Sequence, residues 1–423
     1  MKIFLVDEIM SSGKSHWMLE QMKQWYANKD YDQFVYLSPL LSEVGGVKND
    51  IGMGYLGGRI QSHLPEMGFK YPIPINGSKS KNIRILIHQC KNISATHNLF
   101  LGMDKECIPL LEQNKNVLVI DECLEAYRVF DGITKKSLDA LIRAGMFYYS
   151  EDDYVIHYNH EQFPLHLNEK FEFRELVSLC DTGCVFFVDG NVLVWEFPVE
   201  ILKAFDDIWV LSYLFEGSFM SAWCKINDVE VVRVRPSLNR TTKEVKDYIR
   251  DCIELYEKPD IKKIENYSFS QYWWNDSVVS SVADEISGFL ENAIRKLPCK
   301  AEDILITCPK LNWEHSDNPK DKKRPLIKGK GYSSATWLYS DARATNDFAD
   351  KNTLIYLLGK HPNPLLIHFC SSRGIEFDKD KYALANLLQW IFRGSVRKKE
   401  KMYLILPNKR MRDLFKEWLK DEE

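Results

Sequence analysis

The sequence predicts an α/β protein of two tandem parallel-sheet domains, the first carrying an inserted α+β subdomain. Apolar runs of strand length alternate with amphipathic helical stretches through most of the chain, which is typical of parallel sheets. Polar residues directly follow several of these runs, and ligands of open parallel sheets bind beyond the carboxyl ends of the strands. The 423 residues exceed one ordinary core and suit two domains of about 200 residues each.

Composition and charge narrow the class of protein. The chain is 45% hydrophobic and 27% charged, as soluble globular proteins are, and it lacks an uncharged apolar run of about 18 residues, so we expect no membrane span. Residues 2–6 are too short for the core of a signal peptide, so we expect a cytoplasmic protein. The ten cysteines form no CxxC pair, which argues against zinc. With a net charge of −4, nucleic-acid contacts would need a local basic surface.

The first fifteen residues predict a phosphate-binding loop. An apolar run at residues 2–6 leads into Ser11-Ser12-Gly13-Lys14-Ser15, and an amphipathic helix follows. In such a loop the backbone N–H groups surround a phosphate, Lys14 reaches the β- and γ-phosphates, and the Ser15 hydroxyl ligates Mg²⁺. Glu8 stands where the full motif has its first glycine. The alternative is an ordinary strand–turn–helix in which Gly13 fills a positive-φ position.

Several further strands of the first half are expected to end in polar residues. Residues 43–82 are rich in Gly and Pro and predict a surface loop. The expected strands cover residues 33–37, 83–88, 116–120 and 208–211. Ser38-Pro39, Thr96-His97 and Ser212 lie beyond such runs, so the carboxyl edge of one sheet would bring them together.

Asp121 and Glu122 follow a continuous apolar run, residues 116–120, which suits a strand buried on both faces. An acidic residue at the end of such a strand, downstream of a phosphate-binding loop, is the usual second Mg²⁺ ligand of an ATPase. Asp121 would hold the ion directly or through water, and Glu122 would polarise the attacking water. The alternative is a solvated acidic pair at a helix start.

Residues 124–200 are expected to be an insert in the first domain. They contain a helix-like stretch at 136–147 and a hairpin whose strands, 185–188 and 192–195, flank the turn Asp189-Gly190-Asn191. The histidines at 157, 160 and 166 are better explained as surface or core residues than as zinc ligands, because no cysteine pair accompanies them.

The second half repeats the alternation. We place the domain boundary near residues 224–228, which gives domains 1–225 and 226–423. Thr307 ends an expected strand at 304–307, and Lys310 follows it. A basic loop at residues 320–330, next to Tyr332 and Trp337, suits either nucleic-acid contact or a solvated surface. Further strands are expected at 229–234, 353–358 and 402–406, and helices at 241–257, 383–392 and 411–419.

Taken in order, these motifs resemble those of superfamily-two helicases of the DExH/DEAD type, and most closely the compact helicase-like proteins of bacteriophages and other mobile elements. The resemblance runs from residue 1 to about residue 419. Its strongest parts are MSSGKS, VLVIDE, LSYLFEGS, ARATNDFADKNTLIYL and ALANLLQWIFRGSVRKKEKMYLILPNKRMR.

The resemblance implies two RecA-like domains with ATP and Mg²⁺ bound between them. Lys14, Ser15, Asp121 and Glu122 correspond to the nucleotide and metal residues of the family. Further correspondences give coupling roles to Ser212, Asn346 and Asp347, and catalytic roles to Gln389, Arg393 and Arg397. Arg393 and Arg397, four residues apart, are expected on one helical face, where either could act as an arginine finger. Arg373-Gly374-Ile375-Glu376 competes with the Thr345-Asn346-Asp347 stretch for the preceding motif.

We therefore expect an ATP-dependent nucleic-acid translocase or helicase with a role in DNA replication or recombination. Single-stranded or forked DNA is favoured over RNA, and the insert could dock a partner protein. An ATP-gated switch that binds without unwinding would use the same motifs. A packaging-type motor ATPase is a weaker alternative, because no nuclease-like carboxylate cluster is recognisable. The expected nucleic-acid contacts are Ser38, Pro39, Thr96, His97, Thr307 and Lys310.

Overall fold

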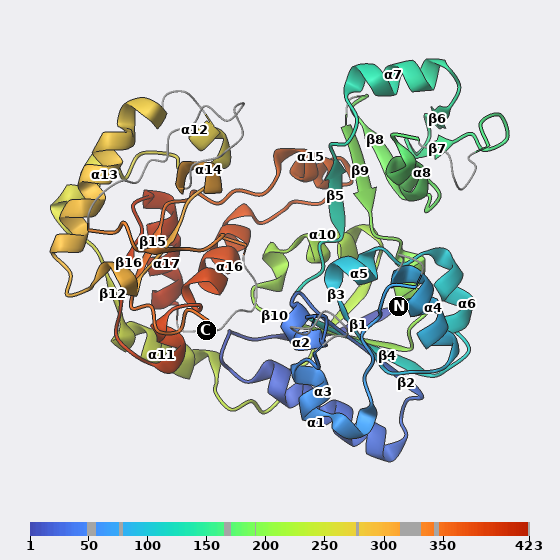
Figure 1. Cartoon of the computed structure of the whole chain (residues 1–423), viewed down its shortest axis with the longest axis horizontal. Coiled ribbons are helices and arrows are strands. Elements are labelled where there is room, and N and C mark those ends of the chain that lie inside the picture. Colours follow the sequence, from blue (N-terminus) through green and yellow to red (C-terminus); the bar gives the residue numbers. More distant parts are fainter. Residues whose placement is uncertain are drawn as a thin grey trace. The chain divides into compact units, whose positions relative to one another are not determined.

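The computed structural model describes the whole chain except residues 49–55, 76–78, 165–170, 191, 276–278, 314–330, 342–346 and 422–423. By its contacts the chain divides into two compact units (Figure 1). The first comprises Met1–Asp7, Ser15–Pro236 and Asn363–Phe377, and the second comprises Glu8–Lys14, Ser237–Pro362 and Asp378–Glu423. Each unit contains one parallel sheet, which confirms the predicted fold class.

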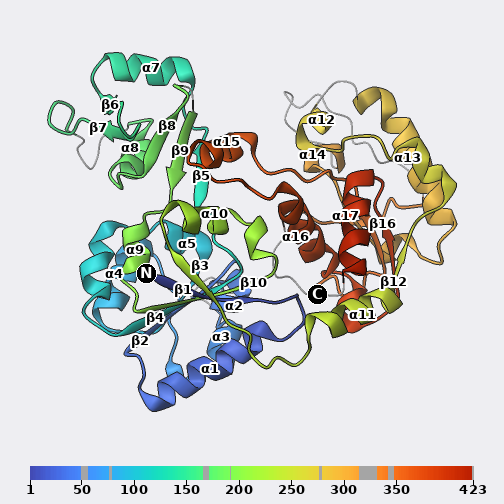
Figure 2. The same ribbon diagram turned by 180° about the vertical axis from the view of Figure 1, so that it is seen from behind.

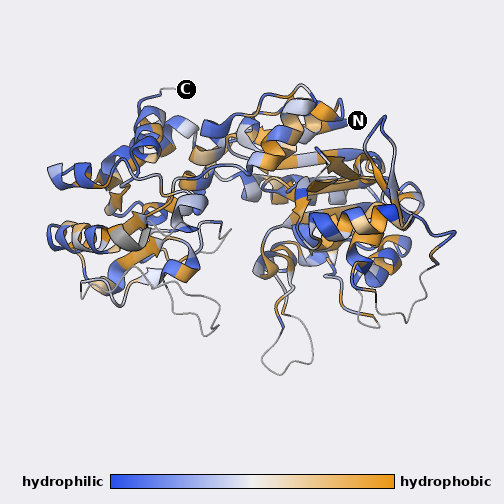
Figure 3. Cartoon of the chain, turned by 90° about the horizontal axis from the view of Figure 1, so that it is seen from above, coloured by the Kyte–Doolittle hydropathy of each residue, from blue (hydrophilic) through white to orange (hydrophobic). Residues whose placement is uncertain are grey.

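The sheet of the first unit has six strands in the order β11-β1-β10-β4-β2-β3, and every neighbouring pair is parallel (Figure 2). Apolar residues dominate these strands (Figure 3), and all of β4 except Asp121 is buried. Burial on both faces is what a parallel sheet covered by helices requires. The strands are β1 (Lys2–Asp7), β2 (Gln33–Ser38), β3 (Ile93–Thr96), β4 (Asn116–Asp121), β10 (Asp207–Ser212) and β11 (Glu230–Arg233).

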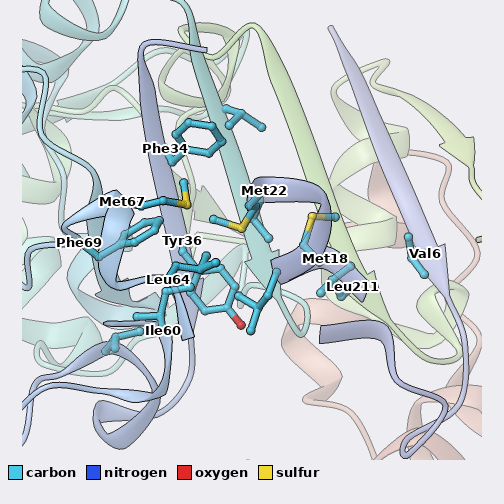
Figure 4. Close-up of a cluster of buried hydrophobic side chains, with 14 residues drawn as sticks. Val6, Met18, Met22, Phe34, Tyr36, Ile60, Leu64, Met67, Phe69 and Leu211 are labelled. Atoms are coloured by element: carbon cyan, nitrogen blue, oxygen red, sulfur yellow. The ribbon is translucent and has the colours of Figure 1, made fainter. Parts of the chain in front are cut away.

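Amphipathic helices accompany this sheet. Met18 and Met22 lie four positions apart on one face of α1, and both enter the core beside Phe34 and Tyr36 of β2 (Figure 4). The helices are α1 (Lys14–Asn28), α2 (Leu41–Val44), α3 (Arg59–His63), α4 (Lys79–His88), α5 (His97–Leu101), α6 (Ile108–Leu111), α9 (Val199–Lys203) and α10 (Phe219–Ile226).

The strand expected at residues 83–88 was wrongly predicted, because this stretch belongs to helix α4. Ile83 and Ile87 are buried whereas Ile85 between them is 42% exposed, which is a helical period of four and not a strand period of two. The strand of this region is β3, which begins five residues after the helix ends. The expected surface loop over residues 43–82 contains α3 and parts of α2 and α4 among its described residues.

The insert forms two antiparallel layers. A three-stranded sheet has the order β5-β9-β8, and β6 pairs with β7. The predicted hairpin is therefore present, as β8 and β9, whereas the helix α7 ends at Arg143, short of the expected end at residue 147. The elements are β5 (Tyr127–Phe130), α7 (Lys135–Arg143), β6 (Phe147–Tyr149), β7 (Ile156–Tyr158), α8 (Arg174–Cys180), β8 (Val185–Val188) and β9 (Val192–Glu196).

A helix from much later in the chain completes the first unit. The helix α15 (Pro364–Ser372) packs against β5 and β9 of the insert (Figure 1). Phe369 of this helix is fully buried, and its ring lies 5.3 Å from that of Tyr127 and 5.5 Å from that of Phe186. Residues 363–377 therefore act as a strap that covers the apolar side of the hairpin.

The second unit has a parallel sheet of five strands in the order β12-β16-β15-β13-β14. The helix expected at 241–257 is shorter than predicted, because α11 ends at Cys252 and the chain continues directly into β12. The strands are β12 (Ile253–Leu255), β13 (Ile304–Thr307), β14 (Thr336–Trp337), β15 (Thr353–Tyr356) and β16 (Met402–Ile405). The helices are α11 (Thr242–Cys252), α12 (Gln271–Asn275), α13 (Val279–Arg295), α14 (Lys310–Trp313), α16 (Lys379–Ile391) and α17 (Lys409–Lys420).

The edge strand β11 bears on the domain boundary. It lies after residue 225, where the first domain was expected to end, yet it pairs with β1 in register from Lys2 opposite Glu230 to Leu5 opposite Arg233. The first sheet therefore continues beyond the expected boundary, and the contact-defined unit continues to Pro236. Six short 3₁₀ segments join the described elements: Pro65–Met67, Lys105–Cys107, Phe215–Gly217, Pro259–Lys263, Ala301–Asp303 and Ser395–Lys398.

Candidate functional site

Polar residues gather at the carboxyl edge of the first sheet. Asp7, Ser38, Thr96, Asp121 and Ser212 are the last residues of five parallel strands. The strand register pairs Asp7 with Ser212 and Ser38 with Thr96, so these ends lie at one edge. The structure thus brings together most of the strand-end residues that the sequence singled out, and it adds Asp7.

Ser15 and Asp121 meet at this edge although they are 106 residues apart in the chain. The Ser15 hydroxyl lies 3.1 Å from Oδ1 and 3.1 Å from Oδ2 of Asp121. Hydroxyl and carboxylate oxygens are the hard ligands that Mg²⁺ takes from a protein when phosphates and water supply the rest. The donor set therefore fits the ion that the sequence implies.

The loop before Ser15 has the backbone shape of an anion cradle. Ser11 has φ of 64° and Gly13 has φ of 106°, so two residues of the loop occupy the left-handed region. Such reversals turn successive N–H groups toward one concavity. A side chain at Gly13 would be strained at this φ and would meet the amide of Asn239 at 3.2 Å. The Lys14 ammonium donates to the carbonyls of Glu8 and Ile9, at 2.5 and 3.0 Å, and so lies over the loop.

Glu8, the departure from the glycine motif, has a structural partner. Its carboxylate accepts a hydrogen bond of 2.8 Å from the hydroxyl of Thr242, the first residue of α11. The backbone N–H of Arg240 donates to the carbonyl of Ser12 at 3.3 Å. Within the second unit, the first residue of α11 and the segment just before it therefore both contact the loop.

A cationic cluster accompanies this segment. The Arg240 guanidinium and the Lys399 ammonium lie 5.8 and 5.2 Å from the ring centre of Tyr248, and the charge of Arg397 also acts on it. Burial raises the pKa of Tyr248, and the nearby Ser11 side chain and the charges of Arg240 and Arg397 partly offset that rise. Sequence reasoning missed Arg240 and Tyr248, because neither belongs to a recognised motif.

Asp121 has two further neighbours. The Tyr36 hydroxyl donates to Oδ2 of Asp121 at 3.0 Å, and Nε2 of His97 lies 3.0 Å from the Asp121 carbonyl. Burial, together with the Asp121 charge, raises the pKa of Tyr36 well above its ordinary value, so this hydroxyl stays protonated and acts as a donor. Sequence reasoning did not single out Tyr36, because it is one aromatic residue of the apolar run QFVYL.

Glu122 is held in an unusual backbone conformation. Its φ is 67°, and its N–H donates to the Leu211 carbonyl of β10 at 2.9 Å. The left-handed region is costly for a residue with a side chain and persists where the surroundings impose it, often at functional sites. Glu122 thus leaves the sheet by a sharp turn directly after Asp121.

Ser212 and the turn that follows it are tied to the end of β1. Ser212 is buried and its hydroxyl lies 3.1 Å from the Cys123 sulfur. Asp7 accepts from the Phe215 N–H at 3.1 Å and from Arg233 at 2.8 Å, and Arg233 also donates to Glu216 at 2.8 Å. These bonds fix the turn after β10 next to the strand that leads into the loop.

The two candidate finger arginines do not share a helical face, so that prediction was wrong. The helix α16 ends at Ile391, Arg393 lies in the following turn, and Arg397 lies in the 3₁₀ segment Ser395–Lys398. The helix does not continue to Arg397, because the backbone is extended at Gly394, with φ of −80° and ψ of −171°. Gln389 is on α16 and half-buried, Arg393 is only 5% exposed, and Arg397 is exposed.

The candidate nucleic-acid residues differ in accessibility. Ser38, His97 and Thr307 are buried, and Thr96 caps α5 by accepting from the Leu99 N–H at 3.3 Å. Pro39 is half-buried, and the Lys310 ammonium lies 6.0 Å from the ring centre of Trp337. Thr96, like Pro39, is half-buried, so Pro39, Thr96 and Lys310 remain the accessible members of the set.

Some predicted features lie elsewhere or outside the described residues. Asn346, His166 and the basic loop at residues 320–330 are not among the described residues, whereas Asp347 is exposed in a turn before β15. His160 bonds to Asp181 at 2.7 Å. Arg373 belongs to the strap of the first unit, with its guanidinium 3.7 Å from the ring centre of Phe369. In the described part of the chain, no helix is long and apolar enough to cross a membrane.

Comparisons with known proteins agree with this architecture. The model of a family described as the YonV C-terminal Rossmann-like domain matches residues 247–419. The SPbeta prophage-derived uncharacterized protein YonV of Bacillus subtilis (strain 168) is 26% identical over 439 residues, an alignment that covers 100% of this chain and 99% of YonV. A solved structure named XPD helicase has a TM-score of 0.50 at 10% identity, and the match covers 100% of this chain and 95% of the other.

At this low identity, the likeness to XPD helicase shows a shared fold. It confirms the predicted fold class of two RecA-like parallel-sheet domains. The prophage origin of the relative agrees with the expected similarity to proteins of phages.

Proposed function

We propose that this chain is an ATP-dependent nucleic-acid translocase or helicase. The observation that carries the proposal is the contact of Ser15 with both carboxylate oxygens of Asp121, each 3.1 Å away, at the carboxyl edge of a parallel sheet. A phosphate-binding loop followed by an acidic motif requires these two residues to meet. An ordinary strand–turn–helix gives no reason for the meeting. The fold shared with XPD helicase supports the same class of enzyme.

In this proposal the chain's own residues bind and orient ATP. The N–H groups of residues 11–15 and the Lys14 ammonium bind the phosphates, and Glu122 orients the attacking water. Mg²⁺ held by Ser15 and Asp121 supplies charge neutralisation on the phosphate oxygens when bound. Glu122 lies in the turn directly beyond the strand that ends at Asp121, with φ of 67°, and this placement suits a role different from that of Asp121.

Arg397 is favoured over Arg393 as the arginine that stabilises charge on the γ-phosphate. Arg397 is exposed, and its charge acts on Tyr248, which lies near Ser11 of the loop. Arg393 is only 5% exposed and would have to leave its packed position to reach a ligand. Gln389 is proposed to act beside Arg397.

The proposed track is single-stranded or forked DNA, in preference to RNA, in replication or recombination. Contacts to a phosphate backbone are independent of sequence and sensitive to salt. Pro39, Thr96 and Lys310 are the proposed contacts with accessible surface. Ser38, His97 and Thr307 are buried and would act by shaping the strand-end loops. Ser212 and Asp347 are proposed to couple hydrolysis to movement, and the insert is a proposed docking element for a partner protein.

The test is the ATPase rate of the wild type and of Lys14→Ala, each with single-stranded DNA, duplex DNA and RNA. We expect one polymer to stimulate the wild type, and Lys14→Ala to lower the rate by about 100-fold or more, because the phosphate charge loses its main partner. Lys23→Ala, an exposed lysine on the same helix, is the matched control and should be unaffected.

Two results would redirect the proposal. Stimulation by DNA without strand displacement would identify an ATP-gated switch, which uses the same residues. No hydrolysis with any polymer, and no binding of Mg²⁺–ATP, would reject the proposed enzyme. Chelation of Mg²⁺ should abolish the activity if Ser15 and Asp121 hold the ion.

A further inference from the structure

We propose that Tyr36 is a positioning residue that fixes the orientation of the Asp121 carboxylate toward Mg²⁺. The inference rests on the proposed function, because it concerns the same metal site. It goes beyond that proposal by assigning a role to a side chain that no motif contains.

The first argument is geometric. Tyr36 and Asp121 lie on the neighbouring parallel strands β2 and β4, with Tyr36 opposite Val119 and Leu37 opposite Ile120. The Tyr36 hydroxyl therefore reaches Asp121 diagonally across the edge of the sheet, at 3.0 Å from Oδ2. Side chains on neighbouring strands of one sheet are held in position more precisely than side chains on a loop.

The second argument concerns the two carboxylate oxygens. Oδ2 faces two hydroxyls, Tyr36 at 3.0 Å and Ser15 at 3.1 Å, whereas Oδ1 faces Ser15 at 3.1 Å. A tyrosine hydroxyl has one proton, which an ordinary phenol keeps at neutral pH, so Tyr36 can donate one hydrogen bond. Donation to Oδ2 makes the two oxygens unequal and leaves Oδ1, beside the Ser15 hydroxyl, as the better placed oxygen for a metal or its water.

The third argument is packing. Tyr36 is 1% exposed and belongs to the core that includes Met18, Met22 and Leu64 (Figure 4). Its ring therefore cannot rotate away without disturbing that core. A merely structural interpretation is available, because a buried hydroxyl needs some acceptor. The two interpretations differ in whether loss of the hydroxyl changes Mg²⁺ binding.

The test compares Tyr36→Phe with Tyr31→Phe. The Tyr31 hydroxyl also donates to a carboxylate, Asp207 at 2.6 Å, but Asp207 is the first residue of β10 and lies at the opposite edge of the sheet. Each substitution removes one tyrosine–carboxylate hydrogen bond and keeps the ring. Affinity for a fluorescent ATP analogue is measured with and without Mg²⁺, together with the Mg²⁺ concentration that gives half-maximal ATPase and the thermal midpoint.

We expect Tyr36→Phe to weaken Mg²⁺-dependent binding and to raise the half-maximal Mg²⁺ concentration by about 10- to 100-fold, as loss of an outer-shell partner does. Affinity without Mg²⁺ should stay within about twofold, and Tyr31→Phe should change neither quantity. Unchanged Mg²⁺ dependence in Tyr36→Phe, whatever its thermal midpoint, would overturn the inference while leaving the proposed function intact. A wild type that binds no Mg²⁺–nucleotide would overturn both.

Discussion

Glu196 is a buried carboxylate at the end of the central strand of the insert. It is 6% exposed and accepts a hydrogen bond of 2.6 Å from Asn227. Burial raises the pKa of Glu196, and the bond from Asn227 and the charge of Arg373 only partly oppose this rise. The ionised form is therefore disfavoured in the folded protein relative to the unfolded chain.

We expect Glu196→Gln to be more stable than the wild type near neutral pH. A carboxyl group whose pKa is higher in the folded state binds protons more tightly there, so stability falls as the pH rises from about 4.5 through the folded pKa. Glutamine keeps an acceptor for Asn227 and does not titrate. Thermal midpoints measured between pH 4.5 and 7.5 should show an advantage of the variant that grows with pH. A constant difference across this range would contradict the prediction.

At the level of residues, sequence reasoning could find Lys14, Ser15, Asp121 and Glu122 because their chemistry is encoded by spacing and by the strand that precedes them. Tyr36 could not be found in this way, since its role depends on which strand lies beside β2. The positions of the two candidate finger arginines were also beyond local pattern, because α16 ends at Ile391 and the backbone is extended at Gly394 between them.

Among the elements, α15 has the most specific packing partner. Phe369 is fully buried between Tyr127 and Phe186, and Arg373, one turn later, lies over the Phe369 ring. The His368 ring also bonds to Asp189 in the hairpin turn at 2.7 Å. The aromatic contacts join this short helix to β5 and β8 of the three-stranded sheet, and the His368–Asp189 bond joins it to the hairpin turn.

We expect Phe369→Ala to release the strap from the insert. Truncating a buried phenylalanine costs about 3–5 kcal/mol, which is more than a nine-residue helix can recover by itself. Hydrogen exchange should accelerate in residues 363–377 and 185–196. Leu365→Ala is the matched control on the same helix, because Leu365 is 40% exposed. Equal protection in the two variants would show that the strap is held by other contacts.

Element types were predictable where an apolar run was continuous or flanked a recognisable turn, and failed where a run fitted both a strand and one face of a helix. The strand β4 and the hairpin β8–β9 were expected at nearly their observed positions. The run at 83–88 has six residues, too few to separate a buried strand from one face of a helix. In the structure it belongs to α4, with Ile83 and Ile87 buried.

For the whole molecule, the alternation of strands and helices was sufficient to predict two parallel sheets. It could not predict that residues 363–377 return to the first unit, because the local sequence does not specify which sheet a helix joins. The strand β11 illustrates the same limit, since its pairing with β1 is decided by the neighbouring strand and not by its own residues.

The insert hairpin is our candidate for a strand separator. Deleting residues 183–196 is expected to abolish unwinding while sparing the proposed DNA-stimulated ATPase, because the proposed ATP-binding residues lie at the edge of a different sheet. Unwinding of a forked duplex and ATPase are measured on the same preparation. Since β9 is the central strand of the insert, the retained ATPase also serves as the control for a folded first unit. Unwinding by the deleted protein would reject the assignment.

The strap also sets an order of events during synthesis. The first unit needs Asn363–Phe377, yet its preceding segment ends at Pro236, so roughly 140 residues must leave the ribosome before the insert can be covered. At ~5–20 residues per second this interval is about 7–28 s. During it the side of the hairpin that carries Phe186 is open to solvent and to other nascent chains. The newly made protein is thus expected to depend on chaperones until residue 377 has emerged.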